Sequence, residues 1–178
     1  HPQTLSLRKM IKEGVIGTPR FIHAEFGFSI QRPGQHFRIE ATLGGGALMD
    51  VGCYCINMIR AIAEQEPQKV LYAPSITETG YDGGGVGLLE FPNGFRGTFA
   101  TSIHTPLQNL VTIQGDNGRI VVPSPWFCES NQILVHLKGQ TKPEIIKTPK
   151  VENIWANQAL VISQLLEKRN VPLMPWED

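Results

Sequence analysis

Six short apolar segments separated by turn residues fill the middle of the chain and most constrain its fold. Two of the connections, Pro92-Asn93-Gly94 and Asp116-Asn117-Gly118, contain Asn-Gly, which readily supplies the positive φ of a tight hairpin turn. Consecutive hairpins predict a mainly antiparallel sheet. The predicted strands are Lys69 to Ser75, Gly85 to Phe91, Phe95 to His104, Leu110 to Gln114, Arg119 to Val122 and Ile133 to Leu137.

Helical patterns lie before and after these six segments. Apolar residues at helical spacing predict helices over Thr4 to Glu13, about Gly46 to Ala63 and about Ile154 to Lys168. Alternation from Phe21 to Phe28 predicts a half-buried strand. The expected fold class is therefore α+β, an open, mainly antiparallel sheet with helices packed on one face.

Composition excludes several classes of function. The 178 residues are 41% hydrophobic and carry no net charge, which is enough for one globular domain with a core. Basic residues form no run, so we expect no nucleic-acid partner. No stretch reads as a membrane span of about 20 apolar residues, and three cysteines without a Cys-x-x-Cys pair favour reduced thiols in the cytoplasm. A start at His1-Pro2-Gln3 suggests a piece of a longer chain.

The segment from Gly44 to Asn57 carries three polar groups on an otherwise apolar helix. A regular helix turns by about 100° per residue, so Asp50, Tyr54 and Asn57 fall within an arc of roughly 60°. A carboxylate, a phenol and an amide on one stripe are groups that bind hydroxyls and move protons. This helix is the first candidate for a functional site.

The same residues also have structural interpretations. The negative charge of Asp50, in the first turn of a helix, interacts favourably with the helix dipole. A lone tyrosine such as Tyr54 is commonly a core aromatic with a satisfied hydroxyl. Arg38 lies in the long polar connection from Gln31 to Leu43, where it is either a substrate-facing cation or a solvated loop residue.

Glycine triads at 44–46 and 83–85 do not form the G-x-G-x-x-G fingerprint of a nucleotide-binding unit. The first triad is interpreted as a turn that lets the backbone approach a ligand or a neighbouring domain, or as a flexible junction before the helix. No metal site is predicted. Cys53 and Cys55 face differently on a helix, and the strand histidines lack paired ligand spacing and are expected to be structural; these are His23, His104 and His136.

The stretch from Gly44 to Cys55 resembles the signature of the glucose-fructose oxidoreductase, inositol dehydrogenase and rhizopine catabolism protein family, the Gfo/Idh/MocA oxidoreductases. His1-Pro2-Gln3, Glu13 to Gly17 and Gly115 to Ile120 resemble further family segments, so the likeness covers nearly the whole chain. It implies that residues 1–178 form a single C-terminal substrate-binding and oligomerisation domain, like the C-terminal domain of glyceraldehyde-3-phosphate dehydrogenase. The NAD(P)-binding Rossmann domain would precede His1.

The resemblance also implies roles for individual residues. An Asp followed four residues later by Tyr is similar to the glucose-fructose oxidoreductase, xylose dehydrogenase and dihydrodiol dehydrogenase branches of the family. Tyr54 would hydrogen-bond the reacting hydroxyl or carbonyl, and Asp50 would hold the substrate or orient the proton-transfer group. Arg38 and Asn57 are the candidate substrate contacts.

The implied cofactor is NAD or NADP, bound mainly by the absent domain, with Gly45 and Gly46 as candidate contacts from this chain. The substrate would be a sugar, polyol or related cyclic hydroxyl compound, selected by the loops Gln31 to Leu43 and Pro123 to Ser130. The chain has no Glu-Lys-Pro motif, which supplies the family's lysine, so it should be inactive alone. The alternative is a non-catalytic sugar-binding or dimerisation module. In both cases the open sheet face is expected to form a homodimer or higher oligomer.

Overall fold

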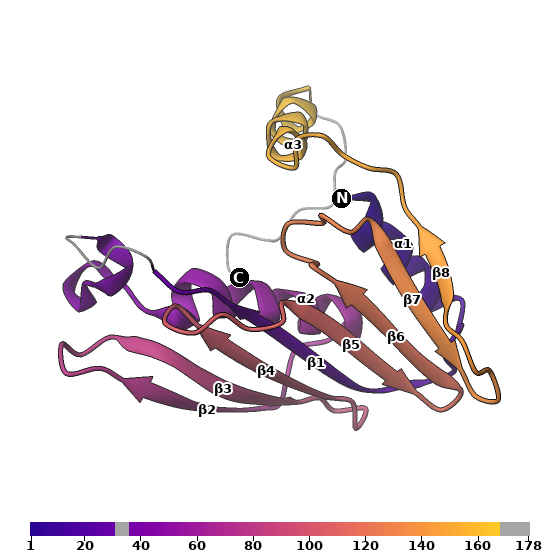
Figure 1. Cartoon of the computed structure of the whole chain (residues 1–178), viewed down its shortest axis with the longest axis horizontal. Helices are drawn as coiled ribbons and strands as arrows, with labels where there is room; N and C mark the ends of the chain where they lie inside the picture. Colours follow the sequence, from indigo (N-terminus) through magenta and orange to yellow (C-terminus); the bar gives the residue numbers. More distant parts are fainter. Residues whose placement is uncertain (31–35, 168–178) are drawn as a thin grey trace.

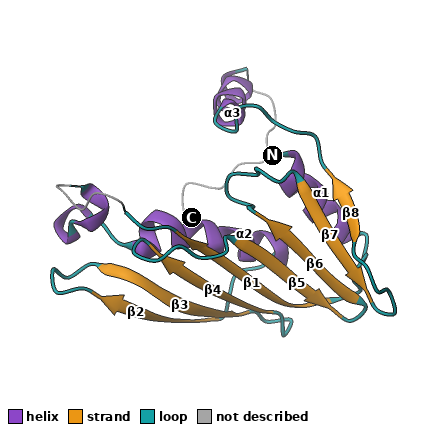
Figure 2. Cartoon of the chain, in the orientation of Figure 1, coloured by secondary structure: helices purple, strands orange, loops and turns teal. Residues whose placement is uncertain are grey.

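The computed structural model describes residues 1–30 and 36–167, and the strands in these residues form one eight-stranded sheet. Its order is β2-β3-β4-β1-β5-β6-β7-β8, and among these neighbours only β1 and β4 are parallel. The sheet is a continuous curved layer (Figure 2), so the predicted α+β class is confirmed. The strands are β1 (Pro19–Gly27), β2 (Lys69–Ile76), β3 (Asp82–Glu90), β4 (Arg96–Ser102), β5 (Leu110–Gly115), β6 (Gly118–Pro123), β7 (Gln132–Leu137) and β8 (Glu144–Lys147).

Two helices lie on one face of this sheet (Figure 1). They are α1 (Pro2–Lys12) and α2 (Cys53–Ala63), and both bury apolar side chains. The third helix, α3 (Ala156–Leu166), stands away from the sheet in Figure 1 and buries none of its residues. The predicted packing of helices on one face therefore describes α1 and α2 but not α3.

A glycine lets α2 approach the sheet closely. A Cβ added to Gly97 of β4 would meet Cγ2 of Ile59 on α2 and would lie 3.3 Å from Cγ2 of Ile22 on β1. Ile22 and Ile59 are both buried, and inward-facing residues alternate along β1. This close contact fixes the helix that carries Tyr54 against the middle of the sheet.

The structure differs from the sequence prediction at several boundaries. The predicted loop from Gln31 to Leu43 contains two short 3-10 turns, η1 (Phe37–Ile39) and η2 (Ala41–Leu43), while residues 31–35 lie outside the described part. Strand β8 was not predicted, because its four residues are too short a run to show alternation. The predicted helix end at Lys168 also lies outside the described residues.

The two Asn-Gly turns use different backbone conformations. Gly94, between β3 and β4, has a φ of 81°, as predicted for a glycine in a tight turn. Neither Asn117 nor Gly118 has a positive φ, so the second prediction of backbone conformation was wrong although the hairpin forms. Position 118 requires glycine for a different reason: a Cβ there would collide with the carbonyl oxygen of His136.

The segment Ala41–Ala63 is long and apolar enough, by length and composition, to pass a test for a membrane span, with a mean hydropathy of 1.2. The prediction that no stretch reaches this length was therefore wrong on that criterion. Its buried residues include Val51, Cys55 and Ile59, which belong to the core against the sheet. This packing gives the apolar segment a role inside the fold.

Candidate functional site

The carboxylate of Asp50 has one oxygen held by the chain and one that is not. Asp50 lies in η3 (Leu48–Gly52), a π-helical turn that leads directly into α2. Nε of Arg38 donates a hydrogen bond to Oδ1 of Asp50 over 2.7 Å. Oδ2 of Asp50 is buried and has no hydrogen-bond partner within the described residues. Because an unsatisfied buried acceptor is costly, Oδ2 is the atom at which a donor from outside this chain would be stabilising.

Arg38 is occupied by contacts within its own loop. Besides its bond to Asp50, its Nη1 lies 3.2 Å from Nε2 of His36, and its guanidinium carbon lies 4.7 Å from the centre of the Phe37 ring. The Arg38 side chain is 33% exposed and that of Asp50 is 16% exposed. The structure thus brings Arg38 to Asp50, and a direct contact between Arg38 and substrate stays a prediction.

Tyr54 lies among aromatic rings at the start of α2. Its ring meets Phe26 edge to face at 5.5 Å and approaches Trp126 at 6.3 Å between ring centres. Phe26 in turn stacks on Trp126 at 5.3 Å and meets Phe127 edge to face. Indole Nε1 of Trp126 donates to the carbonyl oxygen of Glu25 over 2.8 Å, which fixes the ring plane. Such ring pairs contribute about 0.5–1.5 kcal/mol beyond their buried area.

These rings form one wall of a cavity of about 240 Å³. Tyr54 remains 46% exposed, so a bound molecule can reach it. The sequence analysis predicted that the loop with Trp126 and Phe127 helps to select the substrate. For Phe26 it predicted only a position in a strand. The lining residues are His1, Thr4, Phe26, Tyr54, Pro125, Trp126, Phe127, Cys128, Ile154, Trp155, Asn157 and Gln158.

Only part of the predicted stripe of three polar residues lines the cavity. Of Asp50, Tyr54 and Asn57, only Tyr54 is among the described residues that line the cavity. The prediction assumed a regular helix, but residues 48–52 form a wider π-helical turn. Asn57 is exposed on α2 one turn after Tyr54. The site roles of all three residues stay predictions.

The glycine triad at 44–46 makes room for neighbours in the same chain. A Cβ on Gly45 would lie 2.5 Å from the carbonyl oxygen of Phe37, and a Cβ on Gly46 would overlap Oδ1 of Asp82. The peptide N–H of Gly45 donates to the Glu40 carbonyl oxygen, and that of Gly46 donates to the Arg38 carbonyl oxygen. Both predicted cofactor contacts therefore have structural reasons within the chain, and their role toward a cofactor is untested.

The three cysteines and two of the strand histidines have ordinary structural surroundings. All three cysteines are free thiols, and burial raises the pKa of Cys55 to about 12. Nδ1 of His23 lies 2.9 Å from Oγ1 of Thr98, and Nε2 of His104 lies 3.1 Å from the hydroxyl of Tyr81. No group of three or more His, Cys, Asp or Glu side chains gathers in residues 1–30 and 36–167 in a way that could hold a metal ion.

Sequence comparison matches the model of the GFO/IDH/MocA C-terminal domain to residues 4–121. The pig trans-1,2-dihydrobenzene-1,2-diol dehydrogenase (Sus scrofa) is 30% identical over 142 residues, which are 79% of this chain and 41% of that protein. The Bos taurus enzyme of the same name is 32% identical over the same shares. The chain thus spans less than half the length of these relatives.

Solved structures share the fold at lower sequence identity. The aldose-aldose oxidoreductase of Caulobacter crescentus, complexed with glycerol, superposes with a TM-score of 0.82 at 22% identity, over 96% of this chain and 52% of that one. The 3-ketoreductase KijD10 of Actinomadura kijaniata, in complex with NADP and TDP-benzene, gives 0.79 at 23% identity, over 97% and 53%. An inositol dehydrogenase homolog of Azotobacter vinelandii, complexed with NAD+, gives 0.71 at 18% identity, over 83% and 41%.

Proposed function

The chain belongs to the GFO/IDH/MocA family, and we propose that it is the substrate domain of an NAD(P)-dependent oxidoreductase. The reaction would transfer a hydride between nicotinamide and a CH–OH group of a sugar, polyol or related cyclic hydroxyl compound. Relatives named as dihydrodiol dehydrogenases, and structural neighbours solved with NAD+ or NADP, support this class. Residues 1–178 would form a single C-terminal domain of a longer protein whose Rossmann domain precedes it.

The observation that carries this proposal is the position of Tyr54 on the wall of the aromatic cavity, four residues after Asp50. A cyclic diol or sugar ring has apolar faces and a polar edge of hydroxyl groups. Trp126 and Phe127 offer flat apolar surfaces for such a ring. Tyr54 offers a hydroxyl group that can meet the polar edge.

The chain's own residues would bind and orient the substrate. Tyr54 would donate a hydrogen bond to the reacting oxygen, because its phenol carries an O–H donor. Oδ2 of Asp50 would accept a hydrogen bond from the substrate or from the proton-transfer group. The nicotinamide supplies or takes the hydride when it is bound. The donors of Gly45 and Gly46 are already used, so we assign most of the cofactor's binding to the preceding domain.

The uncovered face of the sheet supports a further part of the proposal, association between copies of the chain. Phe21, Leu71 and Val86 are each more than half exposed. Leu71 and Val86 line an apolar hollow of about 550 Å³ that also contains His23 of β1. Exposed apolar surface of this kind is typical of protein interfaces, which supports this part of the proposal. Dimerisation through this face fits both the catalytic domain and the alternative, a non-catalytic sugar-binding or dimerisation module.

The test is to assay the longer protein with NAD+ and NADP+ against a panel of trans-dihydrodiols, aldoses and inositols. Reduction of either cofactor with at least one cyclic hydroxyl compound is the expected result. Saturable sugar binding without turnover, measured by calorimetry, would support the non-catalytic module. Val86→Asp should convert an assembled protein to monomers in sedimentation experiments, with Glu78→Lys on the exposed β2–β3 turn as the matched surface control.

A further inference from the structure

The two glycine triads noted in the sequence meet around one pair of side chains, Tyr72 of β2 and Asp82 of β3. A Cβ on Gly46 would overlap Oδ1 of Asp82, and a Cβ on Gly85 would lie 2.5 Å from the hydroxyl oxygen of Tyr72. Each triad thus leaves the space that one member of the pair fills. Neither triad needs a nucleotide to explain this arrangement.

Asp82 is hydrogen-bonded to the start of the helix that carries Asp50. Its Oδ2 accepts from the peptide N–H of Leu48 over 2.8 Å and from the hydroxyl of Tyr72 over 2.8 Å. Leu48 begins the π-helical turn, and Ala47 before it supplies no side-chain cap. The first N–H groups of a helix have no partner within the helix, and an acceptor carboxylate there is stabilising. Asp82 of β3 therefore caps the start of this helix, where the local sequence provides no capping side chain.

Tyr72 holds Asp82 in place from the sheet. Its ring stacks on Phe99 at 5.8 Å with an angle of 13° between the planes. Gly87 lies between them in the register, paired with Tyr72 on one side and Phe99 on the other. Burial raises the pKa of Tyr72 well above its usual range, and the hydrogen bond to Asp82 raises it further. The hydroxyl consequently stays protonated and acts as a donor to Asp82.

Asp50 is thus tied to the fold through two separate contacts. Arg38 holds its side chain, while Asp82 holds the backbone two residues before it. The two contacts meet at Gly46, whose N–H donates to the Arg38 carbonyl oxygen and whose bare Cα faces Asp82. Displacing the first turn of this helix would move the Asp50 carboxylate relative to Tyr54.

We propose that Asp82, held by Tyr72, is a positioning residue that fixes the first turn of the site helix and so sets the position of the Asp50 carboxylate relative to Tyr54. This inference rests on the proposed oxidoreductase function. A shift of about 1 Å in a catalytic group can cost roughly a hundredfold in rate. The effect is expected in kcat, because the aromatic cavity that binds the ring does not include Asp82.

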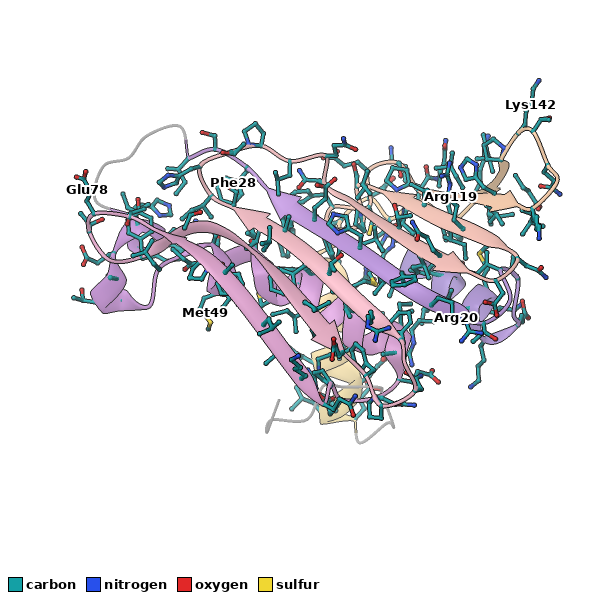
Figure 3. All side chains as sticks on the ribbon, turned by 90° about the horizontal axis from the view of Figure 1, so that it is seen from below. Arg20, Phe28, Met49, Glu78, Arg119 and Lys142 are labelled. Atoms are coloured by element: carbon teal, nitrogen blue, oxygen red, sulfur yellow. The ribbon has the colours of Figure 1, made fainter. Side chains whose placement is uncertain are left out.

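The experiment compares Asp82→Ala, Asp82→Asn and Glu78→Ala in the longer protein. Asparagine keeps an oxygen that accepts from the Leu48 N–H, whereas alanine removes it. Glu78 is an exposed acidic residue at the tip of the same hairpin (Figure 3), so its removal controls for the loss of charge. The measurements are kcat, KM and hydrogen exchange at the Leu48 amide by mass spectrometry or NMR.

We expect Asp82→Ala to lower kcat about 10- to 100-fold with KM within about twofold, and to accelerate exchange at the Leu48 amide. Asp82→Asn should recover most of kcat and of the protection, and Glu78→Ala should match wild type. Rapid exchange at Leu48 with unchanged kcat would overturn the positioning role, as would wild-type protection in Asp82→Ala. If the wild-type protein oxidises no hydroxyl compound, the proposed function fails, while the exchange data still show whether Asp82 fixes the turn.

Discussion

Nε of Arg38 lies 2.7 Å from Oδ1 of Asp50, so a residue of the polar connection is bonded to the helix that follows the glycine triad. The contact leaves the second carboxylate oxygen of Asp50 buried and without a partner in the described residues. It gives Arg38 a contact with the candidate catalytic carboxylate, while a contact between Arg38 and substrate stays a prediction.

Replacing Arg38 by alanine should destabilise the protein by about 1–3 kcal/mol, because it leaves both oxygens of a largely buried carboxylate without a donor. It should also lower kcat, since the carboxylate is no longer held in one orientation. Thermal unfolding and steady-state kinetics provide the two readouts. Lysine at this position should recover part of the stability and part of kcat, because it supplies a donor without the planar guanidinium.

Arg20→Ala is the matched control for Arg38→Ala. Arg20 also pairs with an aspartate, Asp116, at 2.8 Å, but both side chains are about half exposed. Exposed ion pairs contribute little to stability. Equal losses of thermal midpoint in the two variants would contradict the special role given to the Arg38 contact.

Gly46→Ala should destabilise the protein more than Gly44→Ala does. Both glycines have positive φ, at 130° and 73°, so each substitution strains the backbone by at least about 1 kcal/mol. Only the Cβ at Gly46 would overlap Asp82, whereas a Cβ at Gly44 meets nothing within 4 Å. The difference between the unfolding free energies of the two variants measures the free-energy cost of displacing Asp82. Equal values would show that Asp82 moves aside without cost.

The fold was predictable from the sequence because its main signals are local. Turn residues and alternation located β2 to β7, and helical spacing located α1 and α2. The parallel pairing of β1 with β4 left no such signal, since it joins residues more than 70 positions apart. The family resemblance provided the class of fold in which that pairing occurs.

The site was less predictable, because it depends on contacts between distant segments. Asp50 and Tyr54 were predicted as site residues from their spacing on one helix, but the π-helical turn at 48–52 was not predicted. Asp82 and Tyr72 lie on strands that reach the helix only in three dimensions. Their one sequence signal was glycine at 46 and 85, which can be interpreted only when the side chain filling the space is known.

Stability should fall at alkaline pH because of Cys55. Burial raises the pKa of its thiol from 9.0 to about 12, so the folded protein holds this proton more tightly than the unfolded chain does. That contribution is complete below pH 9.0 and is lost as the pH rises toward about 12. Urea unfolding at pH 8 to 11 should show a shallower decline for Cys55→Ala than for wild type. Parallel declines would mean that Cys55 ionises equally well in the folded state.

The most direct test of the central claim, that Tyr54 contacts the reacting oxygen, is the kcat of Tyr54→Phe in the longer protein. The phenylalanine ring preserves the contacts with Phe26 and Trp126, so the thermal midpoint should stay close to wild type. Tyr81→Phe, which removes a hydroxyl bonded to His104, is the matched control and should leave kcat unchanged. Tyr54→Phe should lower kcat by a factor of roughly 100 to 10,000. An unchanged kcat for Tyr54→Phe in an active enzyme would rule out a contact between Tyr54 and the reacting oxygen.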